Sequence, residues 1–477
     1  MSSDPSETLP VSPPKMSSSN VPAMLQAGRM KTNMSMDVSS DVIDPIVIND
    51  RSCRFVIQNK GYLHDGSRIT MGVKTNASIN QGGFFPPNVG CHSLIRRATL
   101  SIGGNVISEI DDYNHFKAYQ SMFLSSEINK SRESVMSGRF VAHEFRYDET
   151  LGAQSSTSAP AYGLDTGINY LSDNVIVPQW LNIKNEPTFS ITLAQLFPFM
   201  KGLNLPLFAM KQEIIIDLLW EPLATQGRVS VDTGASSGKT YPIDTNNVKL
   251  VADHIFYDGE KMAADLNTYM TTDTDFAYND YRLTKTSLSV ADAKNSVRNL
   301  GGAGRVVTKV ITGINDDNRG DGFMLNKYAA IAPNRDYTNA SVELRKNGTL
   351  TANIRMNDFF VFPIDLTNSA VLFDKTTRAE GSLPFVTREE YCAEGNVLTN
   401  NTFHNIPQNA SKGLLGNYFF QSYKLPAGRV NSRGLELTTQ LDALPALAGS
   451  NSYTQRTYIE IGRVATLSRG FLTSGFR

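Results

Sequence analysis

Short runs in which apolar and polar residues alternate dominate the chain from about residue 45 onward. Such a period of two predicts β-strands with one buried face. The first two runs cover residues 53–58, with Cys53, Phe55 and Ile57 on one side, and residues 69–74. They flank the turn pair Asp65-Gly66, and two alternating runs around an Asp-Gly pair predict a β-hairpin.

A second hairpin is predicted over residues 98–110, because Ala98, Leu100 and Ile102 alternate with polar residues before the turn Gly103-Gly104-Asn105. Asp111 or Asp112 then offers an N-cap for a helix. Its apolar face would carry Phe116, Tyr119 and Phe123. Farther along, a helical turn is expected near residues 193–200 and a strand at residues 213–220.

The stretch from Val248 to Met270 joins two β-rich halves. Its first part is a short run of β-forming residues that ends at Asp258-Gly259. Its second part carries Met262, Leu266 and Met270 at intervals of four, which predicts one narrow apolar stripe on a short helix. Asp258 is the expected N-cap of that helix.

The second half repeats this style. Strands are predicted at residues 306–311, 435–441 and 458–467, and Asn347-Gly348 predicts a type I′ hairpin turn. We therefore expect a mainly β protein of two consecutive jelly-roll sandwiches with a few short helices. The predicted units are a flexible N-terminal arm (1–44), a first jelly roll (45–258), a helical linker (259–295) and a second jelly roll (296–477).

The composition of the chain says little more about the fold, but it excludes several classes of function. The 45 Lys and Arg residues against 46 Asp and Glu residues leave a formal charge of −1, so no long-range attraction draws the chain to nucleic acid. The three cysteines predict neither a disulfide framework nor a zinc site. No basic region followed by an apolar core opens the chain, so we expect no secretory signal peptide, and no run is long and apolar enough for a membrane span.

Two Asp-Thr-Gly triplets raise the alternative of an aspartic protease. Asp165 and Asp232 begin these triplets. Aspartic proteases need two such carboxylates that share a proton across a cleft. However, both triplets lie in loop-like surroundings, and their separation is much shorter than in the two-lobed proteases. Two surface turns are the competing interpretation.

The other candidate motifs are weaker. Arg319-Gly320-Asp321 imitates an adhesion tripeptide, which leaves a secreted adhesion or carbohydrate-binding β-sandwich as a further alternative. A solvated turn is the simpler interpretation of so short a motif. The six histidines form no i, i+4 pair, so we predict no catalytic residue, no metal site and no cofactor. Four arginines near the C-terminus are expected to face water, or else an acidic partner: Arg456, Arg463, Arg469 and Arg477.

Residues 94–136 resemble one particular family. The segment Leu94 to Phe116 reads LIRRATLSIGGNVISEIDDYNHF and continues through Tyr119-Gln120-Ser121-Met122. It is similar to the strand, Gly-Gly turn and helix in the first domain of double jelly-roll major capsid proteins from Polinton-like viruses and virophages. Residues 52–73, 211–220 and 250–257 fall where other first-domain strands of that family would lie, and the second half agrees in the order of its elements.

The resemblance implies a structural protein without enzymatic activity or cofactor. It implies that three chains form a homotrimer with a pseudo-hexameric outline, and that many trimers build an icosahedral shell. The implied partners are other copies of the chain within and between trimers, a penton protein, minor capsid proteins and, in some members, an internal membrane, with no sequence-specific nucleic acid. The implied location is the virion, assembled inside the infected host cell.

Overall fold

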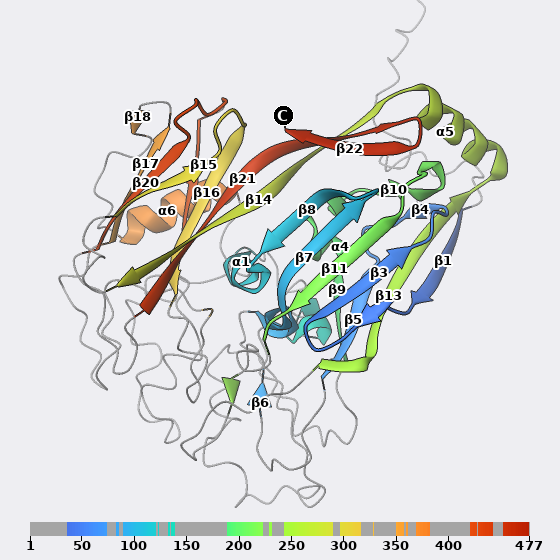
Figure 1. Cartoon of the computed structure of the whole chain (residues 1–477), viewed down its shortest axis with the longest axis horizontal. Helices are drawn as coiled ribbons and strands as arrows, with labels where there is room; N and C mark the ends of the chain where they lie inside the picture. Colours follow the sequence, from blue (N-terminus) through green and yellow to red (C-terminus); the bar gives the residue numbers. More distant parts are fainter. Residues whose placement is uncertain are drawn as a thin grey trace, which may run out of the picture.

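The chain folds into two β-sandwiches that lie side by side (Figure 1). This computed structural model describes the following residues: 36–73, 83–84, 89–120, 123, 132–133, 135–138, 188–222, 229–230, 243–289, 296–315, 328, 350–356, 359–360, 369–381, 420–426, 428–441 and 452–476. All structural statements below concern these residues.

The first sandwich consists of two antiparallel sheets. One sheet has the order β10-β4-β13-β5-β9, and β1 pairs with β13. The other has the order β2-β3-β11-β7-β8. The strands of the first sheet are β1 (Met36–Ile43), β4 (Tyr62–Leu63), β5 (Arg68–Val73), β9 (Thr188–Thr192), β10 (Leu205–Pro206) and β13 (Ile243–Tyr257). Those of the second are β2 (Val47–Ile48), β3 (Ser52–Ile57), β7 (Ile95–Ile102), β8 (Asn105–Asp111) and β11 (Ile214–Trp220).

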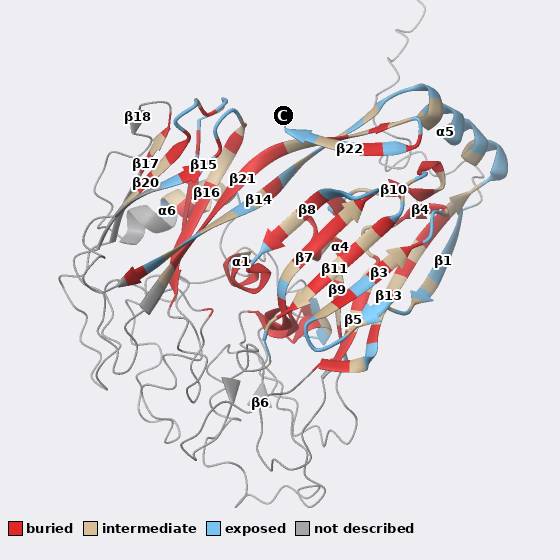
Figure 2. Cartoon of the chain, in the orientation of Figure 1, coloured by how far each residue is buried: buried red, intermediate tan, exposed pale blue. Residues whose placement is uncertain are grey.

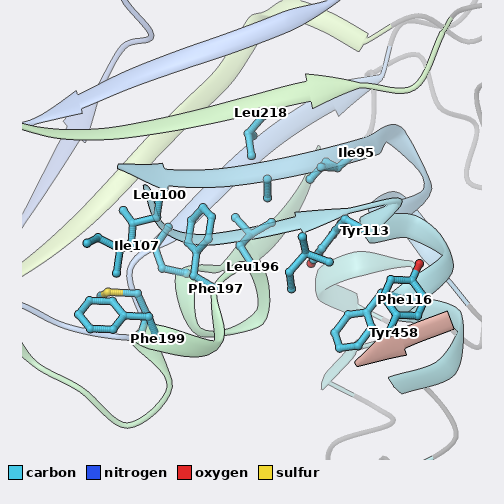
Figure 3. Packing of buried hydrophobic residues seen from close by; sticks show 14 of the residues in the cluster. Ile95, Leu100, Ile107, Tyr113, Phe116, Leu196, Phe197, Phe199, Leu218 and Tyr458 are labelled. Carbon is cyan, nitrogen blue, oxygen red and sulfur yellow. The ribbon is translucent and has the colours of Figure 1, made fainter. Parts of the chain in front are cut away.

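The core lies between these sheets, as the alternation in the sequence requires. In β11 every second residue is buried, with Ile214, Ile216, Leu218 and Trp220 facing inward. Short helices close the sandwich and add aromatic side chains to the core (Figure 3). They are η2 (Gly90–Leu94), α1 (Tyr113–Gln120), α4 (Leu193–Leu196), η5 (Pro198–Met200) and η6 (Leu207–Ala209). A separate small pair joins β6 (Gly83–Phe84) to β12 (Val229–Ser230).

The second sandwich is built from a five-stranded and a four-stranded sheet. The larger sheet has the order β14-β21-β16-β19, with β22 paired to β21, and the smaller has the order β15-β20-β17-β18. Helix α6 (Ser369–Glu380) packs against β19. The strands are β14 (Thr274–Ser289), β15 (Ser296–Gly301), β16 (Val307–Asn315), β17 (Leu350–Met356), β18 (Phe359–Phe360), β19 (Gln421–Lys424), β20 (Leu435–Leu441), β21 (Ser452–Ser468) and β22 (Phe471–Phe476).

Several local predictions are confirmed. Strands β7 and β8 form the second predicted hairpin around Gly103 and Gly104, both of which have positive φ. The predicted turn of helix near residue 193 is α4, and the joint contains α5 (Gly259–Thr271). Asp258 is the N-cap residue of α5, although its side chain makes no capping hydrogen bond.

The first predicted hairpin is wrong. Strand β3 lies in the second sheet of the first sandwich, whereas β5 lies in the first sheet. Between them, the short strand β4 pairs with β13, so the chain has already crossed to the other sheet before Asp65-Gly66. That turn therefore connects β4 to β5, which both run along β13.

The predicted limits of the arm and the linker also differ from the structure. Residues 36–43 of the expected arm form β1, which pairs with β13 through the whole of its length. The expected helical linker, 259–295, is helical only in α5; strand β14 of the second sandwich begins at Thr274. The predicted Asn347-Gly348 turn lies outside the described residues.

Candidate functional site: the contact between the two sandwiches

The contact between the two sandwiches centres on Asp112. This residue follows β8 and precedes α1, and it adopts a left-handed backbone conformation with φ of 45°. Its carbonyl oxygen accepts a hydrogen bond from the N–H of Phe116 at 3.1 Å, which begins the helix. The same oxygen accepts the hydroxyl of Tyr458, on β21 of the second sandwich, at 2.9 Å. Asp112 therefore links a helix start in one sandwich to a strand of the other.

The carboxylate of Asp112 is held by two cations from the second sandwich. The guanidinium Nε of Arg456 donates to it at 2.9 Å and the ammonium of Lys285 at 2.7 Å. Both Asp112 and Arg456 are only 6% exposed, so this pair is almost fully removed from water. Burial alone would raise the pKa of Asp112, but the charges and hydrogen bonds of Arg456 and Lys285 outweigh it and lower that pKa. The carboxylate is thus held in its ionised form.

Aromatic packing surrounds this ion pair. The ring of Phe116 on α1 lies 4.4 Å from that of Tyr281 and 5.2 Å from that of Tyr458, measured between centroids. Figure 3 shows Phe116 facing Tyr458 across the contact. Farther along, Phe199 lies 5.0 Å from Tyr278. These rings are tilted or edge-to-face, the geometry that aromatic pairs favour.

The second sandwich also covers the outer edge of β8. An edge strand carries unpaired backbone groups, which invite association with other strands. Here Arg463 donates from Nη1 to the carbonyl of Ile107 at 2.8 Å, and the hydroxyl of Tyr278 donates to the same carbonyl at 2.6 Å. Arg463 also pairs with Asp280 at 2.8 Å, and Ser108 donates to that carboxylate at 3.2 Å. Side chains of the second sandwich thus occupy the edge of the first.

A second buried network connects α1 to the interior of the second sandwich. Lys309 on β16 lies between Glu380 and Glu460, at 2.9 and 3.1 Å. The hydroxyl of Tyr281 donates to Glu460 at 2.7 Å, and that of Tyr119 on α1 donates to Glu380. Burial would raise the pKa of Glu460, but Lys309 and the hydrogen bonds lower it. The network joins four elements, α1, β14, β16 and β21, to the end of α6.

The expectation that the C-terminal arginines face water is wrong for Arg456 and Arg463. Both reach carboxylates of this same chain, Asp112 and Asp280. Sequence reasoning found Asp112 only as a possible helix cap and missed its partners. The one signal in the sequence concerns the neighbouring pairs: Glu460 and Arg463 interrupt the mostly apolar run of residues 458–467.

The residues of the alternative functions lie outside the described residues: Asp165 and Asp232, and the tripeptide Arg319-Gly320-Asp321. Within the described part of the chain, no group of three or more His, Cys, Asp or Glu side chains is placed to hold a metal ion. No helix in that part is both long and apolar enough to cross a membrane.

Comparison with known proteins agrees with this architecture. Residues 67–258 match the family described as the major capsid protein N-terminus. The quasi-atomic PBCV-1 virus capsid is similar in structure, with a TM-score of 0.56 and 13% identity over 94% of this chain and 98% of that chain. The Sputnik virophage structure gives a TM-score of 0.54 with 10% identity, covering 100% of this chain and 94% of that chain. In sequence, none of the curated proteins matches the chain.

The fold is that of the double jelly-roll capsid proteins, with one jelly roll in each sandwich. The fold and the match over residues 67–258 both agree with the major capsid proteins that the resemblance of residues 94–136 indicated. This agreement supports a structural role in a virion shell. Neither the protease nor the adhesion alternative gains support from these comparisons.

Proposed function

We propose that the chain is a major capsid protein that forms homotrimers of pseudo-hexameric outline, and that these trimers tile an icosahedral shell. The observation that carries this proposal is the pair of sandwiches held side by side by buried ion pairs (Figure 1). Two similar units in one chain give six units around a threefold axis, so three chains can present nearly sixfold contacts. A closed ring of this kind uses one heterologous contact three times.

Strand β1 is the surface to which we assign contacts between copies. It pairs only with β13 among the described strands, so its other edge is open. Figure 2 shows it mostly exposed, and Val38 and Val42 are 57% and 62% exposed. Three further exposed apolar side chains lie within residues 36–47: Met36, Ile46 and Val47. An open strand edge beside exposed apolar side chains is a typical site of association.

The mass of the native protein in solution, with negative-stain images of the same fractions, tests the proposal. We expect three chains per particle and a hexagonal outline, with closed shells at higher concentration. A monomer over a wide concentration range would refute trimerisation. The variant Val38→Asp/Val42→Asp should lose either the trimer or the shell, whereas Val135→Asp, at a side chain 75% exposed elsewhere, should lose neither. Unchanged assembly of the double variant would exclude β1 as the contact.

The finer partners are proposals of the same kind. We propose that the trimers meet a penton protein at the fivefold positions and minor capsid proteins between trimers, that an internal membrane is a further partner, and that assembly takes place inside the infected host cell. The near-zero net charge supports contacts with other proteins over sequence-specific contacts with nucleic acid. Co-purification of a penton protein with wild-type shells, and its absence from isolated trimers, is the expected result.

A further inference from the structure

Three arginines surround the ring of Phe476 at the end of β22. The guanidinium carbon of Arg305 lies 4.0 Å from the ring centroid, that of Arg463 5.4 Å and that of Arg282 5.5 Å. The ring itself remains 45% exposed. Figure 2 shows this end of β22 in the colour of exposed residues, beside the C-terminus marked in Figure 1.

The strand register brings these side chains together. Arg463 on β21 lies directly opposite Phe476 on β22, and Arg282 on β14 lies opposite Ile459 on the same strand β21. Arg305 precedes β16, which pairs with β21 up to Ile461. The end of β22 and the start of β16 therefore meet along one side of β21.

The positive charge of this cluster is only partly balanced. Asp280 pairs with Arg463, but no carboxylate among the described residues forms an ion pair with Arg282 or Arg305. Three arginines against one aspartate leave a local charge of +2. Burial lowers the pKa of Arg305, and the nearby charges of Arg282 and Arg463 lower it further. In addition, Nε of Arg463 is buried without a hydrogen-bond partner among the described residues.

We propose that Arg282 and Arg305, on the exposed ring of Phe476, form a binding site for a phosphate group. Two uncompensated guanidinium groups match the roughly two negative charges of a phosphate monoester better than the single charge of a carboxylate. The planar fork of donors on each guanidinium fits phosphate oxygens in pairs. The aromatic face keeps the guanidinium groups in place and offers an apolar surface beside the bound group.

Titration calorimetry with inorganic phosphate, at constant ionic strength and neutral pH, tests the site on the full chain. Arg282→Gln and Arg305→Gln should each weaken binding about tenfold, because each removes one charge-assisted pair. The double variant should show no saturable binding. Arg51→Gln removes one charge from an exposed arginine elsewhere and should bind as the wild type does. Arg305→Lys keeps the charge but loses the planar fork of donors, so we expect its affinity for phosphate to lie between those of the wild type and Arg305→Gln.

A second titration, with vesicles of phosphatidylcholine with and without phosphatidic acid, separates the sources of the phosphate. Saturable binding of inorganic phosphate that needs both arginines supports a soluble anion. Binding only to vesicles with phosphatidic acid, again lost in the double variant, supports a lipid head group. The proposal is refuted if neither probe binds, if the double variant binds like the wild type, or if acetate competes as well as phosphate. The mass of each sample shows separately whether the trimer has formed.

Discussion

Removing the charge of Asp112 should destabilise the protein strongly. The variant Asp112→Asn keeps the shape of the side chain and suits the left-handed backbone at this position, because asparagine tolerates positive φ better than most residues. Arg456, which is 6% exposed, would then stay buried beside a neutral amide. Breaking a buried ion pair by removing one partner costs about 3–5 kcal/mol. We expect a loss of that size in the free energy of unfolding.

The matched control is Asp217→Asn. Asp217 pairs with Arg54 at 2.6 Å, but the two side chains are 36% and 51% exposed. Surface pairs contribute about 0–1 kcal/mol, so this variant should stay close to the wild type. Urea unfolding, followed through the fluorescence of the buried Trp220, measures the free energy of unfolding of both variants. Equal midpoints for the two variants would refute the assignment of Asp112 as the centre of the contact.

Three further predictions concern pH, a turn and the aromatic contact. Folding lowers the pKa values of Asp112 and Glu460, so the two carboxylates stabilise the protein above their unfolded-state pKa values of about 4, and this stabilisation is lost as the pH falls through their folded-state pKa values. The urea concentration at the unfolding midpoint should therefore decrease when the pH is lowered below about 4. It should decrease less steeply in a variant with Asp112→Asn and Glu460→Gln. Gly434→Ala should lower the melting temperature more than Gly304→Ala. Both glycines have positive φ, which strains an alanine at either position. Only at Gly434, however, would the new Cβ also lie too close to the backbone, at 2.9 Å from the carbonyl oxygen of Gly301. Phe116→Ala should cost about 3–5 kcal/mol in urea unfolding, since it empties a buried site between two tyrosines.

Local signals in the sequence were sufficient to predict single elements. The alternation over residues 213–220 corresponds to β11, whose buried side packs in the core. The Gly-Gly turn of the β7–β8 hairpin and the start of α5 after Asp258 were predicted because turn and cap residues act within a few positions. The resemblance of residues 94–136 then supplied the arrangement of whole domains, which no local signal contains.

The wrong predictions share a physical cause. Alternation indicates which side chains are buried but not which strands pair, so β3 and β5 were joined across two different sheets. Strand β1 escaped notice because most of its side chains are exposed and backbone pairing with β13 holds it in place. Strand β14 was missed for a similar reason, because its sixteen residues carry many polar side chains and are held by backbone pairing with β21.

The contact between the sandwiches could not be predicted because its partners lie far apart in the chain: Asp112 and Arg456 are separated by 344 positions. Aromatic packing around Phe116 supplies apolar burial, but the hydrophobic effect that drives this burial is non-directional. The buried charges supply direction, because Arg456 and Lys285 must reach the Asp112 carboxylate to offset its burial and lower its pKa. The proposed trimer of six sandwiches needs a fixed angle between the two sandwiches of each chain, because any deviation in that angle would occur three times around the ring. We therefore infer that the ion pairs serve geometry, and that Arg456→Met added to Asp112→Asn, which keeps a residue suited to the positive φ at position 112, would restore stability better than it restores shell formation.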